Sequence, residues 1–537
     1  MYLPWFLKGE RAEGEAVSYV SFQQLQAGPV EDRGKEFHGW TDLRDSPPLL
    51  NFRKDSGELS SKGKYIEMNK LEYGEKYHLL NWVSAEEADK STREREKIIE
   101  SLLATVQFGF LNTKLFTHSL SPGCQLCGRG TWSCLFINDI CNTRCFYCPT
   151  AQPSKGEPTT HRIRLPNPND YLDYIEKFKF TGVSISGGEP ILTFDRTVRF
   201  VSNIKRRFGN DIYLWLYTNG LAVTRDKLKV LTDAGLDEIR FNISASNYEL
   251  DRVKQAIGLV EIVTVEIPAI PEDYELLKLI ITKLEEIGVK FLNLHQLRCT
   301  PYNCDNLIRR GYTFVHGPKV TVVESELTAL RVLQHVSEHK IGLPVNYCSF
   351  AYKNRFQTAS YRQRFAPFVC KPFEDITAAG AIRRMSIKGQ PEHVDYAMKQ
   401  LGENNCSPNS CYFERGKCRL TLPQSLWNYL DIGKFSLFLN YYVPQLTLVP
   451  SYQYSFEKVY LNPRKTLLIE KKTVVSGREV KSNRSALKQY LTSSFVDKNG
   501  FGNIPGHNSS ENQFRLSTDF EDIYELEHIK PELQEYY

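Results

Sequence analysis

The chain of 537 residues is too long for one compact core, so its length predicts about two to four domains. A hydrophobic fraction of 41% and an aromatic fraction of 12% are typical of a globular protein, and no apolar run is long enough to span a bilayer. The net charge of +5, from 68 basic and 63 acidic residues, is too small to indicate nucleic-acid binding by itself.

The N-terminus and the cysteine count bear on the compartment. The opening MYLPWFLKGE has no basic leader and no small-residue cleavage site, so we expect a cytoplasmic protein without a membrane segment. A reducing compartment keeps thiols free. We therefore expect clusters among the 13 cysteines to be metal ligands and not disulfides.

Residues 1–118 are mixed and charged, with a loop-rich front and one clear helical run at 91–107. We interpret this part as an accessory region that wraps a core. Residues 131–298 then alternate short β-branched runs with helical segments, several of which end at glycine. The strands predicted in this part are 131–138, 182–186, 212–219, 238–244, 262–270 and 291–298.

Six strand–helix steps predict an α/β fold, a partial (β/α)6 TIM-like barrel that we assign to residues 119–298. In such barrels the chemistry lies at the carboxyl ends of the strands. Beyond the barrel we expect a cysteine-rich extension at 299–419, with a possible auxiliary metal site. Residues 420–537 are predicted to form a small strand-rich domain.

Three cysteines, Cys141, Cys145 and Cys148, follow the first predicted barrel strand with the spacing C-x3-C-x2-C. Deprotonated sulfur is the preferred ligand of zinc and of iron–sulfur clusters. A structural zinc usually takes four protein ligands, whereas three thiolates on a cubane cluster leave one iron open. The missing fourth cysteine therefore favours a cluster that binds something else.

The segment CNTRCFYC, with Tyr147 before its last cysteine, resembles the cluster motif of radical S-adenosylmethionine (radical SAM) enzymes. The segment SGGEP, at the end of the second predicted strand, resembles the glycine-rich edge that approaches the cofactor's amino group in that family. Glycine suits this position because a side chain would block close approach. The resemblance covers about residues 131–298. It implies cofactor contacts from Tyr147, Gly187, Gly188, Glu189 and Pro190.

The resemblance also implies the chemistry. A 4Fe-4S cluster on Cys141, Cys145 and Cys148 would bind S-adenosylmethionine at its open iron. An electron, delivered by a donor such as flavodoxin or ferredoxin, would split the cofactor to a 5'-deoxyadenosyl radical that abstracts hydrogen from a substrate. The protein would position the substrate and exclude water and oxygen.

Alternation along the later strands predicts that Arg240, Thr264, Asn293 and His295 face inward, together with three further polar residues. Family members use polar residues of the fourth and fifth strands for the cofactor, so we predict cofactor contacts from Asn242, Ser244 and Glu266. The alternative is that these polar residues only satisfy one another inside the barrel. For His295 a structural role is the favoured interpretation.

Two further cysteine sets are candidate metal sites. Cys124, Cys127 and Cys134 precede the motif, and a similarity over about 120–365 to an archaeal family related to pyruvate formate-lyase activating enzymes implies Cys348 as a partner. The second set comprises Cys370, Cys406, Cys411 and Cys418. Either set could hold an auxiliary 4Fe-4S cluster or a zinc ion. Cys299 and Cys304 stay unassigned.

The sequence thus predicts a radical SAM enzyme acting on a large substrate, with a peptide or protein favoured over RNA. One alternative is a glycyl-radical-enzyme activase. Another is a non-catalytic zinc or iron–sulfur adaptor that binds RNA or protein. The basic stretch at 458–488 would suit a phosphate backbone, but a solvated charged face is the commoner explanation and the one we favour.

Overall fold

The computed structural model describes residues 61–152, 155–480 and 523–536. The front of the predicted accessory region and the basic residues after 480 lie outside these ranges. Within them, no helix is long and apolar enough to cross a membrane. The chain is an α/β protein with one large mixed sheet and a second, antiparallel sheet.

The centre of the large sheet is the predicted series of parallel strands. Each strand pairs in parallel with the next one along the chain, so the predicted barrel order is confirmed. Their β-branched and apolar side chains are buried on both faces, as strands covered by helices require. The strands are β3 (Trp132–Phe136), β6 (Gly182–Ser186), β7 (Tyr213–Thr218), β8 (Glu238–Phe241), β9 (Ile262–Pro268) and β10 (Phe291–His295).

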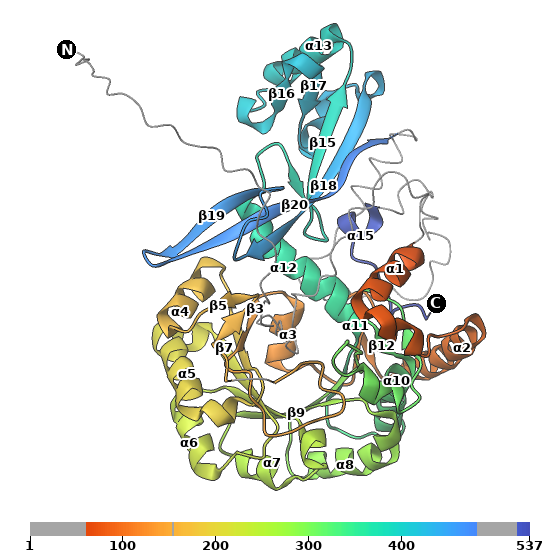
Figure 1. The fold of residues 1–537 in the computed structure, drawn as a ribbon, viewed down its shortest axis with the longest axis vertical. Coiled ribbons are helices and arrows are strands. Elements are labelled where there is room, and N and C mark those ends of the chain that lie inside the picture. The colour runs from red at the N-terminus through yellow and green to blue at the C-terminus, as the bar shows by residue number, and fades with distance from the viewer. Residues whose placement is uncertain (1–60, 153–154, 481–522, 537) are drawn as a thin grey trace, which may run out of the picture. The chain divides into compact units, whose positions relative to one another are not determined.

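Helices cover the outer face of this curved sheet (Figure 1). Each buries one apolar side in the main core and leaves its charged side exposed. They are α4 (Pro168–Lys177), α5 (Phe194–Phe208), α6 (Arg225–Asp233), α7 (Asp251–Ala256) and α8 (Tyr274–Glu286).

The large sheet continues beyond the predicted barrel on both sides and has eleven strands among the described residues. A further parallel strand, β13, pairs with β10, and antiparallel β2 and β1 follow it. Two short strands extend the other side, next to β3. The added strands are β1 (Gln107–Gly109), β2 (Lys114–Phe116), β4 (Thr159–Thr160), β5 (Ile163–Arg164) and β13 (Val345–Cys348).

A short helix, α3 (Pro122–Gly128), lies inside the curve of the sheet (Figure 1). Glycine lets it sit there, because a Cβ on Gly123 would lie 2.3 Å from the Arg240 guanidinium and 3.2 Å from the Trp215 ring. Leu126 of the same helix packs against Gly182 at the start of β6. The helix therefore fills the interior near the amino ends of the strands.

Segments before and after the barrel pack beside it. Helix α2 begins with a capping box between Ser84 and Glu87 and packs along α10. The remaining elements of this part are α1 (Ser61–Tyr73), α2 (Ala85–Leu102), α9 (Cys304–Ile308), β11 (Phe314–Val315), β12 (Thr321–Val322), α10 (Val323–Glu338), α11 (Phe350–Tyr352) and α12 (Thr358–Phe365).

The second sheet is antiparallel, as expected for the strand-rich region, and runs in the order β16-β17-β15-β18-β20-β19, with β14 beside β15. It joins strands from both sides of residue 419, and the predicted domain boundaries stay predictions. Its strands are β14 (Asp375–Ile376), β15 (Ile382–Lys388), β16 (Tyr412–Glu414), β17 (Arg419–Thr421), β18 (Ser436–Thr447), β19 (Ser455–Asn462) and β20 (Lys465–Val480). Two helices accompany it, α13 (Pro391–Glu403) and α15 (Tyr524–Glu527).

Candidate active site

The cysteine loop leaves β3 at its carboxyl end and is held against the end of β6 by main-chain hydrogen bonds. Ile137 N donates to Ser186 O at 2.8 Å, and Gly188 N donates to Asn138 O at 3.0 Å. Glu189 N donates to Ile140 O at 2.6 Å. The two motifs found in the sequence, the cysteines and SGGEP, are therefore directly joined.

Gly187 and Gly188 permit this junction. Gly187 has a φ of +140°, and a Cβ there would lie 2.4 Å from Asn138 O. A Cβ on Gly188 would lie 2.0 Å from Ile140 O. Because the obstacles are backbone atoms, they cannot move aside as a side chain would. Glycine is thus required at both positions by close contact with the backbone of the cysteine loop. The sequence indicated only the close approach of a ligand.

The three thiols of the loop lie near one another. Cys141 Sγ and Cys145 Sγ lie 3.1 Å and 3.6 Å from the same hydroxyl, Thr143 Oγ1. Cys148 is buried, which raises the pKa of its thiol, and the neighbouring thiols Cys145 and Cys141 raise it further. The set is one of soft ligands on a short loop, partly shielded from water. It fits a cluster held by three thiolates.

Tyr147 is fixed on the far side of the loop. Its hydroxyl lies 2.6 Å from Ser244 Oγ and donates to Asn242 Oδ1 at 3.3 Å. Burial raises the pKa of Tyr147 well above its usual value, so the phenol stays protonated. Asn242 and Ser244, which were predicted as cofactor contacts and lie just after β8, therefore contact Tyr147 of the cysteine loop.

A segment after β10 forms hydrogen bonds to the same loop. Asn303, fully buried, donates from Nδ2 to Tyr147 O at 3.0 Å, and Thr300 Oγ1 donates to Pro149 O at 3.1 Å. Arg310 lies 3.6 Å from the centre of the Phe146 ring. These residues were not predicted from the sequence.

Comparison with known proteins identifies the family. The profile of the Radical SAM superfamily matches residues 135–267. A protein of Methanocaldococcus jannaschii, provisionally named as a glycyl-radical enzyme activating enzyme, is 33% identical over 278 residues, which cover 49% of this chain and 72% of that protein. The chain belongs to the radical SAM superfamily. It is a radical SAM enzyme, and its cofactors are a 4Fe-4S cluster and S-adenosylmethionine.

Other matches are shorter or more distant. The GTP 3',8-cyclase of Lactiplantibacillus plantarum is 40% identical over 125 residues, which cover 22% of this chain and only 35% of the cyclase. Streptococcus suis SuiB, solved with S-adenosylmethionine, shares 14% identity, with 56% of this chain and 65% of that chain covered and a TM-score of 0.30. That score is below the level at which a shared fold is inferred.

Within the radical SAM site, Glu189 and Asn219 link the glycine-rich edge to the cysteine loop. The Glu189 carboxylate accepts from Ile191 N at 3.0 Å, from Thr218 Oγ1 at 2.9 Å and from Asn219 N at 2.7 Å. Burial raises the pKa of Glu189, and these donors oppose the rise. The amide Nδ2 of Asn219 in turn donates to Asn142 Oδ1 at 2.7 Å and lies 3.5 Å from Cys141 Sγ.

Glu189 was predicted as a cofactor contact, and its carboxylate is engaged by the chain's own groups. Pro190 follows it and begins a short 3-10 helix, Pro190–Thr193. Asn219, at the end of β7, was missed. The position of Asn219 at the end of a barrel strand could have indicated a role in the site. However, asparagine directly before glycine is equally typical of an ordinary turn.

The inward polar residues of β8, β9 and β10 form one buried network. Arg240 donates to Glu266 Oε2 at 2.8 Å and to Glu238 Oε1 at 2.8 Å. Asn293 donates to the same Glu266 oxygen at 3.0 Å, and His295 bonds the other. Burial favours a raised pKa for Glu266, but the charges of His295 and Arg240 outweigh it and the pKa is lowered.

The predicted inward orientation of these residues is therefore confirmed, and here they satisfy one another as the alternative interpretation expected. A cofactor contact from Glu266 stays a prediction.

Cys124, Cys127 and Cys348 lie together inside the barrel, around the buried Lys114. Burial raises the pKa of Cys127 to about 11. Burial also favours a raised pKa for Cys348, but Lys114 and Lys353 reverse this and lower it to about 6. That Cys124, Cys127 and Cys348 are metal ligands stays a prediction.

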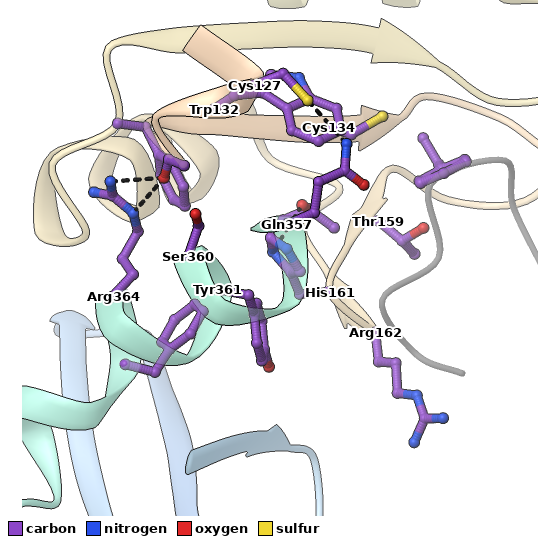
Figure 2. Close-up of a pocket in the computed structure, with 15 residues that line it drawn as sticks. Cys127, Trp132, Cys134, Thr159, His161, Arg162, Gln357, Ser360, Tyr361 and Arg364 are labelled. Atoms are coloured by element: carbon purple, nitrogen blue, oxygen red, sulfur yellow. Dashed lines mark hydrogen bonds between the residues drawn. The ribbon is translucent and has the colours of Figure 1, made fainter. Parts of the chain in front are cut away.

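Cys134 and Cys127 both line a pocket between β3, the β4–β5 hairpin and α12. Figure 2 shows both residues among those lining the pocket, with Gln357 Nε2 donating to Cys127 Sγ at 2.8 Å. Trp132, His161 and Tyr361 supply aromatic walls.

The second predicted cysteine set is divided. Cys370 packs against the barrel core, whereas Cys406, Cys411 and Cys418 pack against the core of the antiparallel sheet. Among the described residues, no three Cys, His, Asp or Glu side chains lie close enough to hold a single metal ion. The assignment of Cys370, Cys406, Cys411 and Cys418 to one metal site stays a prediction. Cys299 and Cys304 are buried thiols in a small apolar cluster.

Proposed function

We propose that this radical SAM enzyme abstracts hydrogen from a peptide or protein substrate. The observation that carries the radical chemistry is the three-thiol loop at the carboxyl end of β3, joined to the glycine-rich edge of β6. Cys141, Cys145 and Cys148 would hold the 4Fe-4S cluster. When bound, the cluster and S-adenosylmethionine supply a 5'-deoxyadenosyl radical.

The protein's own contribution is to orient and shield. Thr143 contacts two of the thiols, Asn219 holds the start of the loop, and Asn303 holds its end. Tyr147, kept protonated by burial, closes the loop against Asn242 and Ser244. We infer that Gly187 and Gly188 contribute main-chain groups next to the cofactor, with Asn242, Ser244 and Glu266 as further contacts.

Two observations support a peptide or protein substrate. The archaeal relative carries the name of an enzyme that acts on another enzyme. In addition, β19 ends the strand order of the second sheet among the described residues, and Tyr460 on it is 66% exposed. A free strand edge can pair with an extended peptide through main-chain hydrogen bonds. Asn462, at the end of β19, is bonded to Asp170 and Asp173 of α4, so this edge adjoins the barrel.

The first experiment tests the radical chemistry. The chain is reconstituted without oxygen, then given dithionite and S-adenosylmethionine, and 5'-deoxyadenosine is measured by chromatography. We expect product from the wild type and from the control Cys411→Ala, a thiol that packs against the core of the second sheet, and none from Cys145→Ala. Product from Cys145→Ala at the wild-type rate would refute the assignment of the loop.

The second experiment tests the class of substrate. A cell extract labelled with deuterium is separated by ultrafiltration into protein and small-molecule fractions. Each fraction is added to the reaction, and the mass of 5'-deoxyadenosine is measured. Deuterium transfer from the protein fraction supports the proposal, and transfer from the small-molecule fraction alone overturns it.

A glycyl-radical-enzyme activase is the more specific candidate, favoured by the name of the archaeal relative. It requires a partner enzyme that gains a backbone radical. Mixing the reduced enzyme and S-adenosylmethionine with such a partner should produce a doublet in the electron paramagnetic resonance (EPR) spectrum. A spectrum without the doublet, together with deuterium transfer from other proteins, would favour a different protein substrate.

A further inference from the structure

Three thiols from two parts of the chain converge on one buried lysine. Cys124 and Cys127 belong to α3, Cys348 ends β13, and Lys114 begins β2. Lys114 is 1% exposed, and its Nζ lies 4.2 Å from the centre of the Tyr352 ring. Its charge interacts with the thiols of Cys348, Cys124 and Cys127. Tyr352 OH lies 3.6 Å from Cys127 Sγ, which closes the group.

Charge balance distinguishes this group from ordinary buried cysteines. A buried ammonium without a counter-charge costs several kcal/mol. Two other cations lie nearby: Arg240, which is paired with Glu238 and Glu266, and Lys353, whose Nζ lies 2.8 Å from His295 Nδ1. One negative charge beside Lys114 is enough to balance it. Three thiolates on an oxidised cubane carry one net negative charge, so Lys114 is compatible with such a centre at these cysteines.

A buried amide gives an independent sign of a missing ligand. Asn346, on β13, is 3% exposed, and its Oδ1 has no hydrogen-bond partner among the described residues. Its Nδ2 donates to Asn293 Oδ1 at 2.9 Å and lies 3.8 Å from Cys124 Sγ. Buried acceptors are rarely left without a partner. This oxygen belongs to the same amide whose nitrogen lies near Cys124, and it is suited to complete the coordination of iron.

We propose that Cys124, Cys127 and Cys348 hold a second 4Fe-4S cluster, whose negative charge Lys114 balances. A cubane spreads its thiolates more widely than a single zinc ion does, and these thiols are not close enough together for a single ion. The same holds for Cys141, Cys145 and Cys148. Three thiolates on an oxidised cubane leave a single net negative charge, which matches one lysine.

Iron analysis after anaerobic reconstitution tests the site. The variant Cys141→Ser/Cys145→Ser/Cys148→Ser removes the ligands of the first cluster, and we expect about half of the wild-type iron and sulfide to remain. Adding Cys124→Ser/Cys127→Ser/Cys348→Ser should remove the rest. Adding Cys406→Ser/Cys411→Ser/Cys418→Ser instead is the matched control and should leave the iron unchanged.

Three outcomes would overturn the proposal: no iron after the first triple substitution, residual iron that follows the control set, or zinc in place of iron. The iron analysis requires neither S-adenosylmethionine nor a substrate. The second cluster can therefore be refuted while the proposed function holds, and the proposed function can be refuted while the second cluster is present.

A milder substitution guards against misfolding of the triple variants. Lys114→Met keeps all thiols, and loss of a neighbouring cation should shift the reduction potential of the residual cluster to more negative values. Lys471→Met, which removes a buried lysine paired with Glu374 in the second sheet, is the control. EPR-monitored redox titration in the loop-triple background measures both. An equal potential in the two variants would contradict the charge-balancing role of Lys114.

Discussion

Asn219 acts on the cysteine loop from the end of a different strand. Its side chain donates to Asn142 and lies against Cys141, while its main-chain N–H is held by Glu189. Groups that orient metal ligands typically change activity by about 10- to 100-fold when they are removed. We therefore predict that Asn219→Ala lowers the rate of 5'-deoxyadenosine formation by about 10-fold or more.

This prediction is checked by measuring iron content and product rate together. We expect iron close to the wild-type value, because all three thiols remain. Asn203→Ala, a change of an amide on the exposed part of α5, is the control and should leave the rate unchanged. A rate for Asn219→Ala equal to that of this control would show that the contact is not needed.

The sequence indicated the cluster ligands and the motif residues next to them. It did not indicate the residues that position these ligands. Three cysteines in eight positions have few explanations, and Tyr147 and the double glycine belong to the same recognisable patterns. Lys114, Asn219 and Asn303 have no such signature, because lysine and asparagine are common at exposed turns. Their roles arise from burial and from contacts across the sheet, which only the folded chain brings about.

At the level of elements, the junction of β6 with the cysteine loop is sterically demanding. A Cβ on Gly188 would meet the backbone of Ile140 at 2.0 Å. We predict that Gly188→Ala displaces the loop and prevents stable cluster binding, with iron falling well below the wild-type value. Gly402→Ala, in α13 with nothing within 4 Å of the added Cβ, is the matched control for anaerobic reconstitution and iron analysis. Full iron in Gly188→Ala would contradict the steric argument.

A second element-level prediction concerns the anchoring of the segment before α2 to the loop between β11 and β12. His316 stacks on Trp82 with ring centres 3.8 Å apart, and its Nε2 lies 2.9 Å from Tyr77 OH. Burial lowers the pKa of His316 to about 4. The unfolded chain binds a proton at about pH 6.5, so folding stability is lost as the pH falls from about 6.5 towards 4.

We therefore expect the wild type to lose more free energy of unfolding between about pH 7 and pH 5 than His316→Gln does. Urea denaturation at the two pH values measures this difference. His78→Gln, at an exposed position, should behave as the wild type. Equal losses in wild type and His316→Gln would rule out the linkage.

The barrel strands were predictable because each is a buried apolar run followed by an amphipathic helix, and β6 was predicted at its observed limits. β13 was not predicted, because its four residues VNYC contain two polar side chains and follow a long helix. β15 was missed for a similar reason: its arginines break the alternation, yet Arg383 is buried through its pairing with Glu527 and Asp375. Tertiary pairing outweighed local pattern in both strands.

At the scale of the molecule, the antiparallel sheet contributes to two separate cores. Val459, Leu467 and Ile469 belong to the barrel core, whereas Leu437 and Leu439 belong to a second core with α13. We predict that Ile469→Ala and Leu437→Ala each lower the free energy of unfolding of the core that they line by about 2–5 kcal/mol. Only Ile469→Ala should weaken the barrel itself.

Native-state hydrogen exchange resolves the two cores. We expect faster exchange in β6 and β7 for Ile469→Ala, and exchange confined to β15–β18 for Leu437→Ala. Faster exchange of β6 and β7 in both variants would indicate a single cooperative core.

The bonds from Thr300 and Asn303 to the cysteine loop connect the two ends of the six-strand series. The loop follows the first of these strands, and the bracing segment follows the last. A ligand that displaces residues 300–306 would also disturb Tyr147 and Pro149, because these two bonds join the segment to the cysteine loop. We therefore expect the geometry of the loop to be sensitive to what occupies the segment after β10.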